Sequence, residues 1–348
     1  PFPGNVIPTA RLSPQALSLL QYFPLPTIDG AEGFNYQAPL VTTTSQTLLT
    51  TRVTQALTTN DQLQGQFSYQ HSTTERTNLL GFTDDYAMSG LDVSVNWTRR
   101  LGRTSMLLRR YQDTAGTNKT KPYFANRTNV SGEAGITGND QSSVNWGPPA
   151  LQFSTITGMS DAVPAFTRDG TNSSGAESTW VHGHHNLTFG GDVRRVTRHD
   201  QASSNPRGSF TFSGKATSSD LADFLLGVPA TSAIAYGNEN RHFRFVSWDA
   251  YVSDDWRFSP TLTLQLGARW EYEGTPTEQN GGMVNLDLAP GFTDASQVLP
   301  GQTGAQTGRT YPASLIHGDW RGLQPRVSFA WRPIPGSSFL LRGGYGVY

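Results

Sequence analysis

The sequence predicts an all-β protein whose antiparallel strands form a section of a transmembrane β-barrel. Two observations support this prediction: long runs alternate strictly between apolar and polar residues, and tight turns alternate with much longer connections. The clearest run separates Leu262, Leu264, Leu266, Ala268, Trp270 and Tyr272 from Thr263, Gln265, Arg269 and Glu271. Its length matches the roughly 9 to 11 residues that a tilted strand needs to cross a bilayer.

The composition agrees with this fold class. Charged residues make up 15% of the chain, and the mean hydropathy is −0.44. No run of about 18 apolar residues occurs, which excludes a helical membrane protein, whereas barrel strands with one polar face keep the average hydrophilic. The net charge of −1 excludes a global basic field for nucleic acid, and the absence of Cys excludes disulfides and thiolate metal sites.

Residues 1–44 are predicted to be a loop segment that leads into the barrel of residues 45–348. A short helix is expected at Ser13–Tyr22, because Ser13 is a suitable N-cap and Pro14 suits the first helical position. The sequence starts at Pro1 without a readable signal peptide. We therefore expect it to be an internal piece of a longer chain.

Five hairpins are expected in the barrel segment. Their turns are predicted at Thr59–Asp61, Leu101–Arg103, Gly183–His185, Arg257–Pro260 and Pro333–Ser337. Residues 112–176 and the section after Thr197 show no sustained period, and the latter contains a helix candidate at Asp220–Leu226. About ten strands result.

All short turns then fall on one edge of the sheet and the long loops on the other. Outer-membrane barrels show this asymmetry, with tight periplasmic turns and long extracellular loops. A soluble sandwich mixes loop lengths, and a propeller repeats at a fixed period that this sequence lacks.

The alternation also predicts which way side chains face. Lipid-facing candidates are Leu262, Leu264, Leu266, Val327 and Phe329, and lumen-facing candidates are Gln265, Arg269 and Glu271. Two aromatic girdles at the membrane interfaces are expected from Trp97, Trp256, Trp270, Tyr272 and Trp331. The competing interpretation is that Trp and Tyr are common in any strand. Asp254 shares the apolar face, and near an interface it would cost only about 0 to 1 kcal/mol.

Few residues indicate chemistry. His182, His184 and His185 could bind a metal, but a solvated polar turn is the favoured interpretation. Asp84–Asp85 and Asp254–Asp255 are interpreted as loop and lumen charges rather than as acid–base or calcium pairs. We therefore predict no enzyme activity, no cofactor and no metal.

Several motifs resemble the barrel of TonB-dependent receptors, most closely the Oar-like group, whose full chains carry a carboxypeptidase-regulatory-like domain. They are FGGDVRR (189–195), DLADFLLGVP (220–229), WDAYVSDDWRFSPTLTLQLGARWEYEGTPTE (248–278) and LQPRVSFAWRP (323–333). The resemblance implies a plugged barrel of about 22 strands. It also implies energy from the TonB complex, whereas the plug and the N-terminal domain are absent from this sequence. A section with two open edges cannot sit in lipid alone.

The leading functional prediction is a section of an outer-membrane receptor that takes up a nutrient through a plugged barrel. Its expected partners are outer-membrane lipid, the TonB complex, its own plug and an unknown nutrient, with no nucleic acid. One alternative is a barrel for adhesion or protein export, and another is a soluble β-rich binding or carbohydrate-active module. The ligand is not specified by the sequence, because the same barrel serves many ligands.

Overall fold

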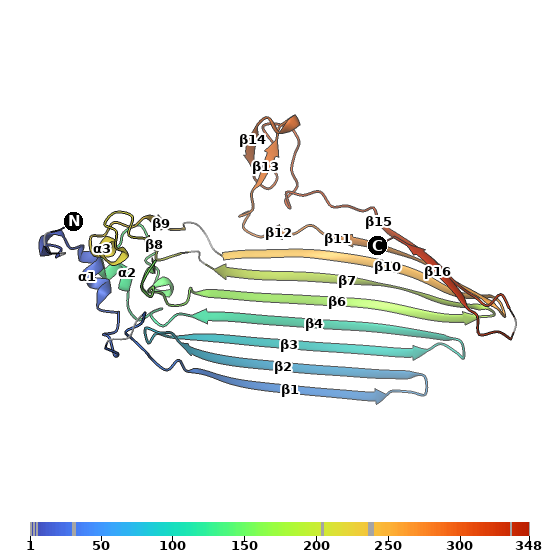
Figure 1. The fold of residues 1–348 in the computed structure, drawn as a ribbon. Helices are drawn as coiled ribbons and strands as arrows, with labels where there is room; N and C mark the ends of the chain where they lie inside the picture. Colours follow the sequence, from blue (N-terminus) through green and yellow to red (C-terminus); the bar gives the residue numbers. More distant parts are fainter. Residues whose placement is uncertain are drawn as a thin grey trace.

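The computed structural model describes residues 2, 4, 6–29, 33–202, 205–235, 240–334 and 336–347. One large antiparallel sheet dominates them (Figure 1), in the order β1-β2-β3-β4-β6-β7-β10-β11-β15-β16, with β12 beside β10. The strands are β1 (Thr42–Ala56), β2 (Asp61–Thr77), β3 (Thr83–Arg100), β4 (Ser105–Lys121), β6 (Ala165–His182), β7 (His185–Ala202), β10 (Asn240–Ser259), β11 (Leu262–Glu273), β12 (Thr277–Glu278), β15 (Gly322–Trp331) and β16 (Leu341–Gly346). The prediction of an all-β fold of antiparallel strands is confirmed.

Smaller elements occupy the long connections. They are the strands β5 (Ala150–Phe153), β8 (Ser209–Phe212), β9 (Thr231–Ala233), β13 (Asn285–Leu288) and β14 (Ala295–Val298), and the helices α1 (Pro14–Leu20), α2 (Val130–Glu133) and α3 (Asp220–Leu225). Three 3-10 turns, η2 (Thr9–Arg11), η3 (Ser143–Asn145) and η4 (Pro290–Phe292), complete the described elements. No helix in the described part of the chain is both long and apolar enough to cross a membrane.

Tight turns and long loops lie at opposite ends of the strands (Figure 1). The shortest turns have two residues each, 183–184 between β6 and β7 and 260–261 between β10 and β11; in the first, Gly183 takes the positive φ of 58° typical of such hairpins. The fifth predicted turn includes Pro335, which lies outside the described residues. The connections 122–164, 203–239 and 274–321 are the long ones, as predicted.

Several strands are longer than predicted, β4 and β6 among them. β4 continues to Lys121 and β6 begins at Ala165, so the prediction of an irregular stretch over residues 112–176 is wrong at both ends. Residues 112–121 and 165–174 are polar on both faces and therefore do not alternate. Cross-strand pairing, from Ser105↔Trp180 to Thr120↔Ala165, extends the strands where the pattern gives no signal.

Paired residues of neighbouring strands point to the same face, so the register traces each face across the whole sheet. One row joins Tyr69 and Leu91, and a second joins Val95, Tyr111, Ser174, Val193, Trp248 and Tyr272. We call the face that carries these residues the apolar face and the opposite one the polar face. Every strand of the main path contributes to both.

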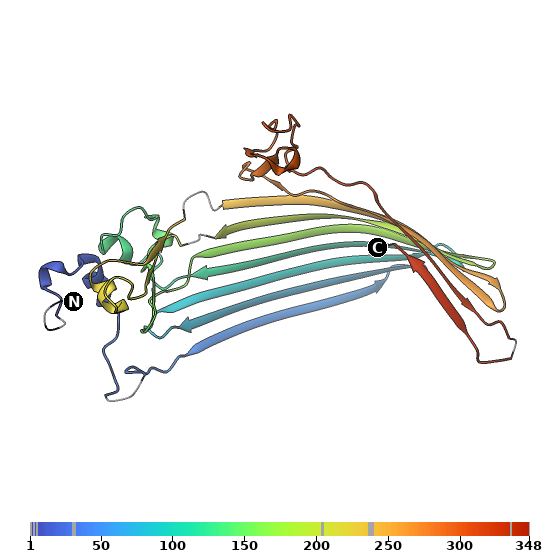
Figure 2. The same ribbon diagram turned by 45° about the horizontal axis from the view of Figure 1, so that its top comes forward.

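The buried core lies beyond the strand ends, not within the sheet. There the loops form a cap, visible at the left of Figure 2, in which α1 and α3 pack with β5, β8 and β9. Its core contains Leu19, Phe82, Phe124, Met159, Phe212 and Phe224. Ser13 caps α1 by accepting a hydrogen bond from the Ala16 amide, as the sequence predicts.

Candidate functional site

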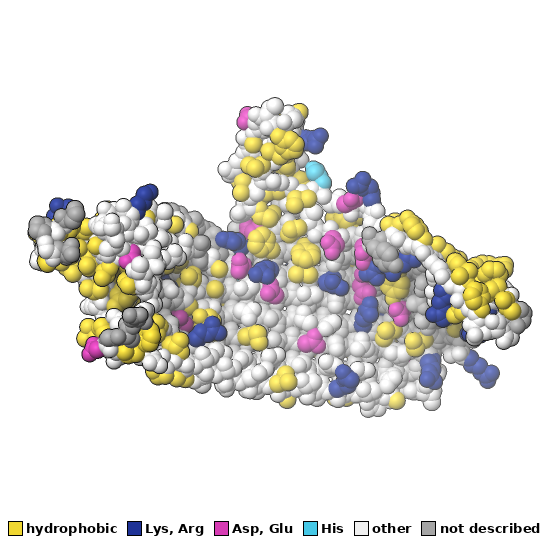
Figure 3. All heavy atoms as spheres, in the orientation of Figure 1, with side chains coloured by type: hydrophobic (Ala, Val, Ile, Leu, Met, Phe, Trp, Pro, Cys, Tyr) yellow, Lys and Arg dark blue, Asp and Glu magenta, His cyan; other side chains and the backbone are white. Residues whose placement is uncertain are grey.

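The polar face carries a connected set of charged and hydrogen-bonding side chains near the middle of the sheet (Figure 3). Arg110 on β4 donates from Nε and Nη2 to the two carboxylate oxygens of Asp192 on β7, at 3.1 and 2.5 Å. These strands are not neighbours, because β6 lies between them and places Gly175 in the same row. A Cβ atom at Gly175 would overlap the Asp192 carboxylate, so the bridge requires glycine there.

The same arrangement occurs one strand further along. The Tyr251 hydroxyl on β10 donates to Glu177 on β6, across Gly190 of β7. A Cβ atom at Gly190 would lie 2.8 Å from the Tyr251 hydroxyl oxygen. Two glycines on adjacent strands thus open two lateral polar contacts.

The three predicted lumen-facing residues extend this set toward β15. Arg269 donates to Glu271 at 2.6 Å, and its Nη2 lies 3.5 Å from Asp249 Oδ1. Gln324 on β15 donates to the second oxygen of Glu271 at 2.7 Å. Ser328 donates to Gln265 at 2.8 Å. We call Arg110, Glu177, Asp192, Asp249, Tyr251, Arg269, Glu271 and Gln324 the polar network.

The polar network can hold the sheet laterally and present charge to whatever fills the space beside it. Two guanidinium groups meet four carboxylates in it, and the Arg269 guanidinium also lies 5.9 Å from the centre of the Tyr251 ring. Sequence reasoning placed only Arg269 and Glu271 of this network in the lumen-facing set, because the lateral contacts Arg110–Asp192 and Tyr251–Glu177 join residues about 75 or more positions apart along the chain. The glycines opposite long polar side chains are the signal that could have indicated these contacts.

The predicted lipid-facing and girdle residues all lie on the apolar face. Leu262, Leu264 and Leu266 pair with Trp331, Phe329 and Val327. Trp97, Trp270 and Trp256 reach the same face through the register of the strands between them. The structure thus separates them from the three lumen-facing candidates.

Asp254 has a partner that the sequence did not indicate. Its Oδ2 atom lies 2.7 Å from His185 Nδ1, and the His185 ring stacks on Trp256 with centroids 5.2 Å apart. His182 stacks separately on Trp180. Within the described ranges, no three His, Cys, Asp or Glu side chains are grouped to hold a metal ion.

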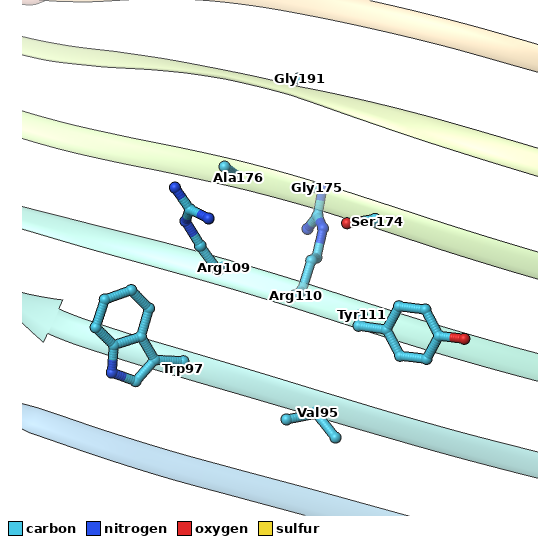
Figure 4. A pocket seen from close by; sticks show the side chains of 9 residues that line it. All are labelled: Val95, Trp97, Arg109, Arg110, Tyr111, Ser174, Gly175, Ala176 and Gly191. Carbon is cyan, nitrogen blue, oxygen red and sulfur yellow. The ribbon is translucent and has the colours of Figure 1, made fainter. Parts of the chain in front are cut away.

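A shallow hollow interrupts the apolar face (Figure 4). Trp97, Arg109 and Tyr111 border it from β3 and β4, while the small residues Ala176 and Gly191 form its floor. Arg109 is a charged exception on this face, five positions after the end of the turn at residues 101–104. Its long stem allows the guanidinium to reach the nearby interface.

The 274–321 loop is organised around Asp287, which is fully buried. Asp287 accepts hydrogen bonds from the Gln306 and Thr307 amides at 2.6 and 3.0 Å, and from the Thr307 and Tyr311 hydroxyls at 2.6 and 2.9 Å. Burial opposes ionisation here, but these hydrogen bonds outweigh it and lower the pKa of Asp287 to about 2.

The same loop returns to the apolar face through Trp320. Its ring stacks on Tyr272 at 3.8 Å and on Trp270 at 6.0 Å, and Trp270 Nε1 donates to its carbonyl at 3.0 Å. Trp320 was missed because it lies outside any alternating run. It enlarges the aromatic group at this end of β11.

The cap contains a buried ion pair between Arg207 and Asp161. Arg207 also donates to the carbonyls of Asn145 and Ala162, at 3.0 and 2.9 Å. Burial outweighs the opposing effect of Arg207 and, with the neighbouring Asp84 carboxylate, raises the pKa of Asp161 to about 6.

Comparison with known proteins places this geometry in context. A family model described as an outer membrane beta barrel domain matches residues 1–348. No curated protein sequence matches the chain. Similar solved structures include the alcaligin outer membrane receptor FauA from Bordetella pertussis, with 10% identity, a TM-score of 0.42, and coverage of 84% of this chain and 34% of that one.

Two further solved structures are similar to a comparable extent. The copper transporter OprC shows 10% identity and a TM-score of 0.44, over 87% of this chain and 36% of that chain. The outer membrane transporter YddB from Escherichia coli shows 9% identity and a TM-score of 0.44, over 90% of this chain and 41% of that chain. The chain thus spans between about a third and two fifths of the length of these three proteins.

Proposed function

The chain belongs to the outer membrane beta barrel domain family, and from this premise we propose that it forms part of the wall of a TonB-dependent receptor of the Oar-like group. Its location is the bacterial outer membrane. The proposed role is uptake of a nutrient, with binding at the extracellular loops and passage through a plugged barrel. The proposed role is not catalytic.

The polar network is the observation that supports this role. Charged side chains exposed to hydrocarbon are costly, so a face that carries two arginines and four carboxylates belongs toward a polar interior. There Gln265, Arg269 and Glu271 would line the path or contact the plug, while the apolar face meets lipid.

Closure of the wall needs further strands. Among the described residues, β1 pairs only with β2, and β16 only with β15. Open edges leave backbone N–H and C=O groups without partners, which the hydrocarbon region does not tolerate. We therefore propose that these strands belong to a barrel of about 22 strands, which encloses a plug and is energised by the TonB complex.

A cross-linking experiment on the full-length protein tests the orientation of the polar face. We expect a single cysteine at Gln265 to cross-link to the plug through a short cysteine-to-lysine reagent, and the matched cysteine at Leu264 not to do so. Mass spectrometry of the linked peptides identifies the partner. Cross-linking from Leu264 and not from Gln265 would reverse the assignment of the two faces.

Uptake measurements test the transport role. Cells that express the full-length protein, with or without functional TonB, are supplied with labelled ferric catecholates, cobalamin, oligosaccharides and peptides. Uptake of at least one probe that requires both the protein and TonB is expected. Uptake that persists without TonB argues against this mechanism.

A further inference from the structure

The apolar face becomes basic beyond one of its aromatic rows. The row of Tyr111, Trp248 and Tyr272 is followed, toward the long loops, by three rows that contain first Arg195, then Arg244, then Arg168, His199 and His242. We call these five residues the outer basic patch. They come from the adjacent strands β6, β7 and β10.

The patch forms a hollow and not a flat surface. Its five side chains line a cavity of about 480 Å³, where small residues such as Ala115 and Gly170 leave space between them. His199 and His242 stack with ring centroids 4.0 Å apart. The three arginine side chains are exposed. Several hydrogen-bond donors therefore converge on one opening.

Asp169 and Asp200, the acidic residues of β6 and β7 nearest to the patch, point to the opposite face. Asp169 pairs with Arg198 at 3.5 Å and Asp200 pairs with Arg241 at 3.9 Å, all four on the polar face. Among the described residues, Asp113 is the one carboxylate in the rows of the patch, and it lines the same cavity. Within the described part of the chain, no ion pair engages Arg168, Arg195 or Arg244. Their charges are thus available to a ligand.

The depth of the patch identifies the chemistry of that ligand. Successive rows on one face are two residues apart, so the patch lies roughly 7 to 20 Å along the strands from the aromatic row. Aromatic residues mark the interface, and the headgroup layer beyond the hydrocarbon is about 5 to 8 Å thick on each side. The row of Arg195 therefore lies at this layer, and the rows of Arg244 and Arg168 lie beyond it on the water side. Arginine binds phosphate through two parallel hydrogen bonds, and basic clusters next to the headgroup layer attract anionic lipids.

We infer that the outer basic patch binds the phosphate groups of an anionic lipid in the leaflet around the long-loop end of the barrel. Three arginines spread over three rows suit a headgroup with more than one phosphate. The lipid site rests on the proposed function in one respect only, namely that the apolar face points toward lipid. Transport does not require it.

Lipid titration of the full-length protein tests the site. The protein in dodecyl maltoside micelles is titrated with diphosphoryl lipid A, and bound lipid is counted by native mass spectrometry. We expect the variant Arg168→Ala/Arg195→Ala/Arg244→Ala to bind at least about tenfold more weakly, because three charge-assisted contacts are lost. The matched control Arg194→Ala/Arg241→Ala changes arginines of β7 and β10 on the opposite face, neither of which lines the cavity, and is expected to stay within about twofold.

The outcomes of this titration separate the lipid site from its alternatives. Weaker binding by the patch variant alone supports the lipid site, and retention of TonB-dependent uptake by that variant separates the site from transport. Unchanged binding by the patch variant overturns the inference, as does an equal loss in the control. Displacement of the lipid by low millimolar inorganic phosphate would assign the patch to free phosphate instead. If the triple variant fails to fold, the three single Arg→Gln variants are each expected to weaken binding, and three unchanged affinities overturn the inference.

Discussion

At the scale of single residues, two glycines make the lateral contacts of the polar face possible. Gly175 and Gly190 lie between strands whose long side chains meet over them, Arg110 with Asp192 and Tyr251 with Glu177. A strand glycine usually weakens a sheet, because it adds backbone entropy without side-chain packing. Here the space that a Cβ atom would fill is occupied by a charge-assisted hydrogen bond between two strands that flank the strand of the glycine.

We predict that Gly175→Ala destabilises the full-length protein by about 1 to 3 kcal/mol, because the added methyl group overlaps the Asp192 carboxylate. Gly116→Ala is the matched control, since Gly116 is on the polar face of β4 and a Cβ there meets nothing within 4 Å. The control is expected to stay within about 0.5 kcal/mol. Urea unfolding in lipid vesicles measures both, and equal values for the two variants would show that no such constraint exists.

His185 and Asp254 illustrate how a charge is accommodated on the apolar face. We predict that His185→Ala costs about 1 to 3 kcal/mol, because the Asp254 carboxylate loses the partner 2.7 Å away. Adding Asp254→Ala should recover part of this loss, since no unpaired charge remains. The free energies of unfolding of the two single variants and the double variant form the test. Additive losses would mean that the two side chains do not interact.

At the scale of elements, alternation identifies a strand only where its two faces meet different surroundings. Strand β11 was predicted almost to the residue, because one face carries Trp and Leu and the other Arg, Gln and Glu, whereas β10 continues through residues 257–259 of the predicted turn. The far ends of β4 and β6 carry Thr, Asn, Ser and Lys on both faces, so their pairing could not be read from the sequence.

The cap and the contacts of the polar network were also beyond prediction. The parallel pairing of β5 with β8 joins segments about 60 residues apart, and the network contacts span three strands. Neither leaves a local pattern in the sequence. Predictable features were therefore the faces of the alternating runs and the order of short and long connections, whereas lateral partners depend on the register.

The assignment of the apolar face can be tested on β11. We predict that Leu264→Arg, which places a charge in mid-strand on this face, costs about 2 to 4 kcal/mol of stability in the membrane. The neighbouring Gln265→Arg puts the same side chain on the polar face and should be tolerated within about 1 kcal/mol. Heat-modifiable mobility of the full-length protein on gels reports assembly. Loss of assembly by Gln265→Arg alone would mean that the apolar face and the polar face have been assigned the wrong way round.

The cap should respond to pH through Asp161. Its pKa of about 6 in the folded cap exceeds the value of about 3.9 for an unfolded chain, so the folded form retains the proton longer. The contribution of Asp161 to stability is therefore greatest below about pH 4, falls as the pH rises to 6, and is constant above. Asp161→Asn should remove this dependence of stability on pH, measured by hydrogen exchange of residues 143–163 and corrected for intrinsic rates. The control Asp29→Asn, at an exposed position, should keep it. An unchanged slope in Asp161→Asn would assign the dependence to another group.

At the scale of the whole molecule, the register reveals the tilt of the strands. One row joins the pairs Gln55–Leu63, Trp97–Arg109, Ala176–Gly191 and Ala250–Trp270. The two members of these pairs are 8, 12, 15 and 20 positions apart along the chain. The separation grows by 12 positions over three hairpins, or four positions per hairpin. Each of the two strands of a hairpin therefore gains two residues from one hairpin to the next. Because one hairpin contains two strands, the stagger is one residue from each strand to its neighbour.

This stagger explains how one row can reach both predicted girdles. Trp97 is four positions before Leu101 at its turn, whereas Trp270 is ten positions after Pro260. Residues in one row therefore lie at different depths. If all the turns lay at the same distance from this row, Trp97 and Trp270 would lie at the same interface.

A stagger of one residue per strand fixes the angle between the strands and the barrel axis. With about 3.3 Å per residue along a strand and about 4.8 Å between strands, the angle is about 35°, within the range of membrane barrels. We predict this tilt for the full-length protein in oriented bilayers, measured from the amide I dichroism in polarised infrared spectra. The measurement depends on the backbone alone, so it tests the barrel independently of any side-chain substitution. A tilt below about 20° would mean that the turns do not lie at a common depth, and the division of Trp97 and Trp270 between two girdles would then be wrong.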